Sequence, residues 1–239
     1  MLRLYKLDIQ QLQAGYGHLI VISDVSLSVE KGTLTCIVGP NGSGKSTLIK
    51  AIFSMSNVFS GKIFIDGDDV TQKGARNTLR KGLAYVPQVR NVFGSMTVEE
   101  NWNVAANAAK NIKADDDLER AFSLFPKLPD RRKQKASTLS GGERQMVAAG
   151  MGIMAGANTL IMDEPTAGLA IRVAKHLLAD FKKLTKEGFT IVIVEQNVRT
   201  GLEVADNALV LVSGRTAYSG DAGVLLREKD LGRLFMGTD

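Results

Sequence analysis

Gly39-Pro-Asn-Gly-Ser-Gly-Lys-Ser-Thr47 fits the pattern Gly-x-x-x-x-Gly-Lys-Ser, and much of the remaining sequence can be interpreted around it. In this pattern glycines let backbone amides turn towards phosphate oxygens, and the next helix presents its positive N-terminus. The apolar run 34–38 predicts a buried strand before the loop, and the run 48–53 predicts a helix after it. An ordinary glycine-rich turn would need neither flanking element. The stretch therefore predicts a phosphate-binding loop.

The loop assigns expected roles to single side chains. Lys45 can reach the β- and γ-phosphates of a nucleotide, and Ser46 can ligate Mg²⁺. Because the backbone of the whole loop would surround the phosphates, the expected ATP-binding residues are Gly39, Pro40, Asn41, Gly42, Ser43, Gly44, Lys45, Ser46 and Thr47.

An acidic pair follows the apolar run Thr159-Leu-Ile-Met162. Asp163 would hold Mg²⁺ or its water, and Glu164 would polarise the attacking water. A solvated turn could also carry two acidic residues, but a buried strand before them favours a site. The loop and the pair together predict metal-assisted hydrolysis of a nucleoside triphosphate.

Composition limits the possible class of protein. The 239 residues suffice for one large α/β domain or two lobes. The single cysteine, Cys36, excludes a disulfide within the chain and favours a reducing, cytoplasmic location. Residues 1–8 lack the apolar core of a signal peptide, and no run approaches the ~20 apolar residues that span a bilayer. We therefore expect any membrane association to come through a partner.

The net charge of +5 permits contact with nucleic acid or an anionic membrane. No long basic block is present, so a solvated surface with a modest basic excess is the preferred interpretation.

Hydrophobic periodicity predicts the other elements. Residues 3–29 alternate apolar and polar side chains, which favours antiparallel β-structure with a turn at Gly15–Gly17. From about 92 to 155 the pattern is helical, and Thr97-Val-Glu-Glu100 fits a capping box. Residues 130–135 predict a charged, solvated linker. Further expected elements are a hairpin at 61–68, strands at 83–86, 159–162 and 190–194, helices at 145–157 and 172–186, a hairpin at 209–219 and a helix from 222 onward.

The helix expected at 145–157 contains three glycines, at positions 150, 152 and 156. Each would cost roughly 1 kcal/mol relative to alanine in an exposed helix. Their presence therefore predicts that this helix is buried and closely packed.

Three motifs carry a resemblance to a known family. Gly39–Thr47 resembles a Walker A motif, Leu139-Ser-Gly-Gly-Glu143 the signature of ATP-binding-cassette (ABC) proteins, and Leu160-Ile-Met-Asp-Glu-Pro165 their Walker B strand. The signature is the most discriminating, because Walker motifs occur in many P-loop enzymes. Tyr16 is similar to the family's aromatic adenine platform, and Gln88 to its Q-loop. The resemblance covers nearly the whole chain.

The resemblance implies an α/β P-loop NTPase fold, with a RecA-like core, an antiparallel β-subdomain and a helical signature subdomain. Residues 1–239 would form a single ABC ATPase domain. Its nucleotide-binding core would comprise 1–88 and 157–239, and its helical subdomain about 89–156.

The resemblance also implies a mechanism that uses two ATPase subunits packed head to tail. Ser140, Gly141 and Gly142 would contact the γ-phosphate held by the opposite subunit. Gln88 would touch Mg²⁺ or its water and report its state to a membrane subunit. Residues 89–94, with Val92 and Phe93 expected to be exposed, are the candidate docking surface.

Within the family, tracts such as Tyr85-Val-Pro-Gln88 and Val194-Glu-Gln-Asn197 resemble the ATPase subunits of branched-chain amino-acid importers. The expected partners are a second ABC ATPase, identical or homologous, integral membrane permease subunits and, indirectly, a solute-binding protein. The resemblance implies a peripheral location on the inner face of the cell membrane, and no nucleic acid partner. The transported solute is not encoded in these motifs.

Three positions depart from the family pattern. Gln196 stands where a switch histidine is usual; it can donate a hydrogen bond to the γ-phosphate but cannot carry a positive charge. Ala170 replaces a common aspartate in the D-loop, Gly168–Ala170, and Gly150–Gly152 lacks an arginine often found there. Slower or partner-dependent hydrolysis is a consequence we expect. Because Glu164 is intact, hydrolysis is still predicted.

Three alternatives remain open at this point. A soluble ABC ATPase acting on nucleic acid or the ribosome would commonly carry a long coiled-coil insertion or a second cassette, and neither is visible. A P-loop phosphoryl transferase would have no use for Leu139–Glu143. A subunit that binds nucleotide without hydrolysing it would be compatible with Gln196.

Overall fold

The computed structural model describes residues 5–110 and 114–227, and the C-terminal part of the helix expected from 222 onward lies outside them. A six-stranded sheet occupies the centre in the order β10-β9-β3-β8-β7-β6. Its strands are β3 (Leu34–Val38), β6 (Leu83–Val86), β7 (Thr159–Asp163), β8 (Thr190–Glu195), β9 (Asn207–Val212) and β10 (Arg215–Asp221). Only β10 pairs antiparallel; the strands from β9 to β6 are parallel.

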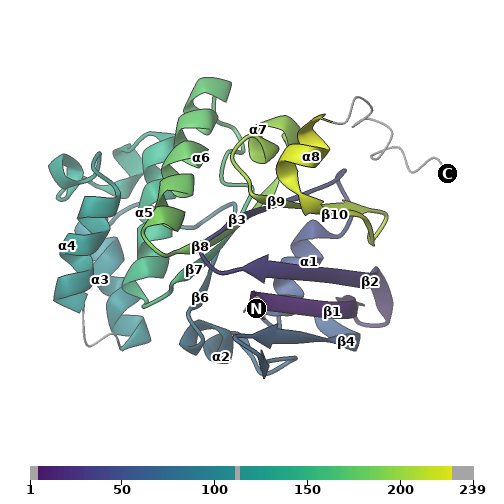
Figure 1. Ribbon diagram of the computed structural model, residues 1–239. Coiled ribbons are helices and arrows are strands. Elements are labelled where there is room, and N and C mark those ends of the chain that lie inside the picture. The colour runs from purple at the N-terminus through teal and green to yellow at the C-terminus, as the bar shows by residue number, and fades with distance from the viewer. Residues whose placement is uncertain (1–4, 111–113, 228–239) are drawn as a thin grey trace.

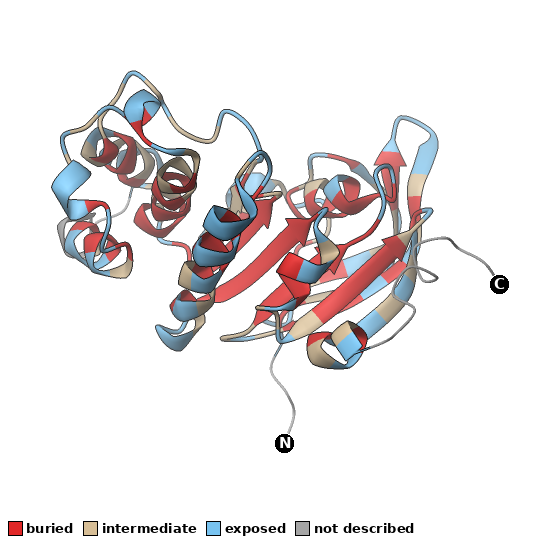
Figure 2. Cartoon of the chain, turned by 90° about the horizontal axis from the view of Figure 1, so that it is seen from above, coloured by how far each residue is buried: buried red, intermediate tan, exposed pale blue. Residues whose placement is uncertain are grey.

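The central strands are buried along their whole length (Figure 2). They are short and apolar, as expected of parallel strands that are covered on both faces. The α/β class with a P-loop is confirmed, and each strand predicted from an apolar run is present.

A second sheet, antiparallel, has the order β2-β1-β4-β5. It comprises β1 (Tyr5–Tyr16), β2 (Leu19–Glu30), β4 (Asn57–Ile65) and β5 (Asp68–Asp69). The turn between β1 and β2 is formed by residues 17 and 18, not 15–17, because Gly15 and Tyr16 still pair with Ile20 and Leu19.

Helices surround these sheets, and Figure 1 shows α3, α4 and α5 gathered at one end, away from the antiparallel sheet. The α-helices are α1 (Lys45–Ile52), α2 (Ala75–Arg80), α3 (Val98–Ala109), α4 (Ala114–Leu124), α5 (Gly141–Met154), α6 (Ile171–Lys186), α7 (Val198–Leu202) and α8 (Ala222–Arg227), with 3₁₀ turns at Pro129–Arg131 and Ala136–Thr138. None of the helices within the described ranges combines the length and apolarity needed to cross a membrane.

Two sequence expectations for the helical region need correction. Helix α5 begins at Gly141 rather than at 145, because Ser140 and Glu143 form a second capping box besides the predicted one at Thr97. The segment 130–135 is not a merely solvated linker. The Arg132 guanidinium binds the Glu99 carboxylate at 2.9 Å through both Nε and Nη2 and so ties this segment to α3.

Gly150 and Gly152 permit close packing of α5, as predicted. The prediction is wrong for Gly156, because α5 ends at Met154 and Gly156 lies in the following turn with φ of 84° and open space beside it. Trp102 of α3 lies fully buried against α5, and its indole nitrogen donates to the Val147 carbonyl at 2.9 Å. A Cβ at Gly150 would lie 2.4 Å from the Trp102 ring, and one at Gly152 would lie 2.7 Å from a Leu160 methyl. The helix therefore approaches α3 and the sheet more closely than any side chain would allow.

We expect Gly150→Ala to destabilise the protein, although alanine favours helices. The added methyl would collide with the rigid Trp102 ring, and such overpacking costs about 1–3 kcal/mol, against a propensity gain of about 1 kcal/mol. Urea unfolding followed by circular dichroism measures the net change. Asn103→Ala, at an exposed position of α3, is the control and should not destabilise. A Gly150→Ala protein as stable as the wild type would contradict this account of the packing.

Candidate functional site

The phosphate-binding loop connects β3 to α1, and close approach fixes two of its glycines. A Cβ at Gly39 would lie 2.1 Å from the Leu211 carbonyl oxygen, and one at Gly44 would lie 2.4 Å from an Ile22 methyl. Gly44 also has φ of 100°, which favours glycine. It caps α1 without any side-chain hydrogen bond, so the first amides of the helix are left to a ligand. Asn41 to Thr47, with Val21 and Glu164, line a cavity of about 180 Å³.

Lys45 is buried in this loop, and its ammonium group donates to the carbonyls of Gly39 at 2.7 Å and Pro40 at 2.9 Å. Burial lowers its pKa, while the nearby carboxyl groups of Glu164 and Asp163 act in the opposite direction. The ammonium therefore already points along the loop, and phosphate oxygens can replace the two carbonyls as its acceptors.

Asp163 ends β7 beside the start of α1. Burial raises its pKa, the Tyr85 hydroxyl donates to Oδ2 at 3.2 Å, and the Ser46 hydroxyl faces the same carboxyl group. Burial also raises the pKa of Tyr85, which keeps this phenol a donor. The other oxygen, Oδ1, is buried without a hydrogen-bond partner among the described residues. A carboxylate oxygen left in this way, with a hydroxyl beside it, suits a hard cation such as Mg²⁺.

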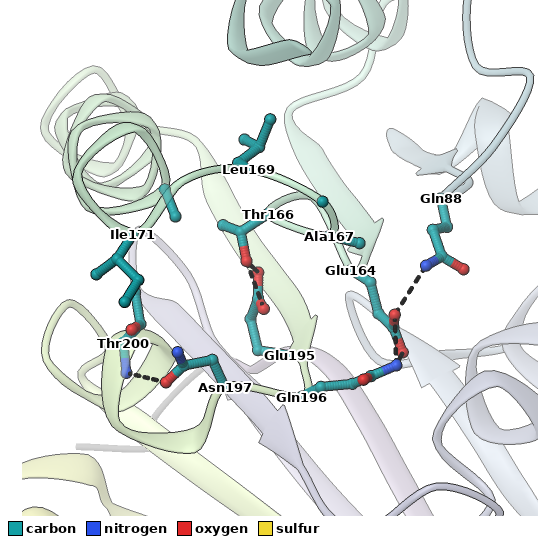
Figure 3. Close-up of a pocket in the computed structure, with 12 residues that line it drawn as sticks. Gln88, Glu164, Thr166, Ala167, Leu169, Ile171, Glu195, Gln196, Asn197 and Thr200 are labelled. Atoms are coloured by element: carbon teal, nitrogen blue, oxygen red, sulfur yellow. Dashed lines mark hydrogen bonds between the residues drawn. The ribbon is translucent and has the colours of Figure 1, made fainter.

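Glu164 follows directly and is held by two amide side chains (Figure 3). The Gln88 amide donates to its carboxylate at 2.8 Å, and the Gln196 amide nitrogen lies 2.7 Å from both of its oxygens. Sequence reasoning assigned Gln88 to a metal and Gln196 to a γ-phosphate, but did not anticipate that both would meet at Glu164. Glu164 has φ of 47°, a conformation that non-glycine residues rarely adopt.

A second glutamate, Glu195, lies behind this site and was not assigned any role from sequence. It ends β8, and the Thr166 hydroxyl lies 2.8 Å from both of its carboxyl oxygens. Burial raises its pKa to about 7, and the Glu164 charge raises it further, whereas Thr166 and the backbone N–H of Gln196 lower it. The one available signal was an acidic residue continuing the buried pattern of its strand.

The signature residues lie apart from the phosphate loop within one chain. Ser140 caps α5, and with Gly142 it lines a different cavity near His176. A Cβ at Gly141 would lie 2.5 Å from a Leu169 methyl, so this glycine permits contact with the D-loop. Tyr16 is 42% exposed at the end of β1, with the Lys50 ammonium 5.6 Å from the centre of its ring.

The Glu195 carboxyl makes stability depend on pH. Its pKa rises from 4.5 to about 7 on folding, so the unfolded chain ionises first as pH increases. We expect the difference in the free energy of unfolding between the wild type and Glu195→Gln to be independent of pH below about pH 4.5. Between there and pH 7 the wild type should lose about 3 kcal/mol relative to the variant, at about 1.4 kcal/mol for each pH unit. Urea titrations of both proteins across this range measure the difference. A difference that stays constant with pH would contradict the assignment.

Comparison with known proteins agrees with the geometry of the loop and the acidic pair. Residues 22–167 match the family model described as "ABC transporter". The chain is 43% identical to a "probable branched-chain amino acid transport ATP-binding protein LivF" from Archaeoglobus fulgidus, over 95% of this chain and 97% of that protein. It is 33% identical to a "high-affinity branched-chain amino acid transport ATP-binding protein BraG" from Pseudomonas aeruginosa, covering 97% and 99%.

Solved structures agree with these relatives. The ADP conformation of MJ1267, described as an ATP-binding cassette of an ABC transporter, superposes with a TM-score of 0.85 at 26% identity and covers 98% of this chain and 99% of that one. A phosphoryl transferase is therefore not the right class. The chain belongs to the ABC transporter family and is an ATP-hydrolysing subunit of a transporter.

Proposed function

We propose that this chain powers an importer of branched-chain or related amino acids, and that it does so by ATP-driven, head-to-tail dimerisation. The observation that carries the substrate class is the 43% identity to the LivF protein over 95% of the chain. The phosphate loop and the signature residues line separate cavities. This separation supports a mechanism in which the signature acts on the nucleotide of a second subunit.

The nucleotide would be held by the loop Gly39–Thr47, with Lys45 at the β- and γ-phosphates and the exposed Tyr16 ring against the adenine. Ser46, Asp163 and Gln88 would hold Mg²⁺, and the orphaned Oδ1 of Asp163 is the observation that supports this set. A bound Mg²⁺ supplies charge neutralisation at the phosphates.

Glu164 would act as the base that polarises the attacking water. Its carboxylate accepts hydrogen bonds from Gln88 and Gln196, which orient it over the cavity beside the loop. The Gln196 amide has a second hydrogen to donate, and a γ-phosphate is the acceptor that we propose for it. Hydrolysis at this site would thus need no charged switch residue.

A second ABC ATPase, identical or homologous, would complete the site with its Ser140, Gly141 and Gly142. These residues begin a 14-residue helix whose positive end suits a phosphate. We propose that residues 1–88 and 157–239 act as the nucleotide-binding core, and about 89–156 as the helical subdomain that presents the signature to the partner.

An apolar groove offers the docking surface for an integral membrane permease. It has a volume of about 510 Å³ and is lined mainly by apolar side chains from the end of α1, from α2, β6 and α5, including Met55, Leu79 and Met151. One end of the groove is formed by Arg90 and Asn91, two and three residues after Gln88. A permease bound there would therefore contact the segment that carries Gln88. The occupant of the groove is, in this proposal, a short amphipathic helix of the permease. A solute-binding protein would act only indirectly, through the permease.

The loop beside the groove differs from the sequence expectation. Val92 is half-buried against the core, whereas Phe93 is 48% exposed. The Asn101 side chain accepts a hydrogen bond from the Phe93 backbone N–H at 2.7 Å and donates one to the Phe93 carbonyl at 3.1 Å. Phe93 therefore projects from an anchored loop, and it remains the contact residue that we propose. Assembled in this way, the chain would lie peripherally on the inner face of the membrane.

Reconstitution in liposomes with permease subunits of a branched-chain amino-acid importer, chosen by their ability to bind this chain, tests the proposal. We expect ATP-dependent uptake of leucine, isoleucine or valine when the matching binding protein is supplied. In this system Met55→Asp and Phe93→Asp should lower uptake at least tenfold, because each buries an unpaired charge at the contact. ATP binding should be unchanged. Val224→Asp, an exposed position on α8, is the control. Wild-type uptake by both Met55→Asp and Phe93→Asp would contradict the docking surface, and uptake of no amino acid would contradict the substrate class.

A further inference from the structure

We infer that Glu195 and Thr166 form a buried clamp that positions Glu164 and Gln196 for hydrolysis. The inference rests on the proposed role of Glu164 as the base. Neither clamp residue would touch the nucleotide; both would act through the residues that they hold.

The clamp joins the ends of two neighbouring strands. Glu195 is the last residue of β8, and Thr166 lies two residues after Glu164 in the loop that leaves β7. Their exposed fractions are 2% and 8%, and the Thr166 hydroxyl lies 2.8 Å from both carboxyl oxygens. The backbone N–H groups of Thr166 and Gln196 also favour the charged form of this carboxyl group and so lower its pKa.

These contacts close a ring around the proposed base (Figure 3). The chain runs from Glu164 to Thr166, the hydrogen bond crosses to Glu195, the next residue is Gln196, and its amide returns to Glu164 at 2.7 Å. The ring therefore fixes both the backbone on which Glu164 stands and the donor that holds its carboxylate.

The Glu164 backbone needs such support. Its φ of 47° is disfavoured for a residue with a side chain, and conformations of this kind persist only where the surroundings enforce them. The Glu164 N–H donates to Val194 at 2.9 Å, which anchors the loop before the clamp, and Thr166 anchors it after. Without the clamp, the loop from 165 to 169 would be held mainly by its own turn hydrogen bonds, from Ala167 to Glu164 and from Leu169 to Thr166.

Stability alone does not explain a carboxyl group at this position. A buried carboxyl beside a second carboxylate is unfavourable, and an apolar pair of similar volume would serve packing at least as well. Thr166 and Glu195 also line the cavity of about 280 Å³ that Glu164, Gln88 and Gln196 face. Their place in this cavity favours positioning as their role.

Two measurements on the full chain test the clamp with the variants Glu195→Ala, Glu195→Gln and Thr166→Val. In steady-state ATP hydrolysis, Glu195→Ala and Thr166→Val should lower kcat about tenfold or more and leave KM for ATP within about twofold, because geometry rather than binding is lost. Glu195→Gln keeps an oxygen acceptor of the same reach and should retain most of kcat. Glu187→Gln, on the exposed end of α6, is the matched control.

Amide hydrogen exchange of residues 166–169, without nucleotide, is the second measurement. We expect about tenfold faster exchange in Glu195→Ala and Thr166→Val, and wild-type rates in Glu195→Gln and Glu187→Gln. Unchanged exchange in the first two variants would overturn the clamp, and faster exchange with unchanged kcat would overturn its positioning role. Because exchange needs no turnover, it tests the clamp separately from the proposed function, which a wild-type chain that binds no ATP would contradict.

Discussion

The parallel register of β3, β8 and β7 is the constraint on which the site depends. In this register Val38 pairs with Glu195, and Asp163 pairs with Val194, so three strands end at one level. The phosphate loop follows the end of β3. The acidic pair lies at the end of β7, and Gln196 follows the end of β8. Because the strands are buried on both faces, a slip by one residue would exchange the side chains packed on the two faces and disrupt the packing of both, so the register is strongly fixed. The geometry of the proposed site therefore follows from the packing of the core.

The same core keeps the signature at a distance from the phosphate loop. Helix α5 packs on the sheet and on α3 through glycines, and its N-terminus opens into another cavity. In the proposed head-to-tail arrangement, a second cassette would complete the wall around a nucleotide held on the loop. The apolar groove lies between β6 and α5, where a membrane partner would contact both the segment after Gln88 and the helix that carries the signature.

Sequence alone could predict the fold class, the strands and the phosphate loop, because their signals are local: apolar runs, glycine spacing and a capping box. The start of α5 was missed although Ser140-Gly-Gly-Glu143 carries the same local capping signal as Thr97–Glu100, because the stretch was interpreted only as the family signature. The hydrogen bonds from Gln88 and Gln196 to Glu164 join residues 76 and 32 positions apart, and sequence spacing carries no information on them. Glu195 was missed because it looked like the end of a strand, and only burial beside Thr166 distinguishes it.

The mass of the Glu164→Gln protein in solution, with and without Mg²⁺ and ATP, tests most directly whether a split site draws two cassettes together. Removing the base should trap the nucleotide between two subunits. The account predicts a monomer without ATP and a dimer with ATP, formed by this chain or by an equimolar mixture with its homologous partner ATPase. A protein that binds ATP and stays monomeric in both cases would contradict it.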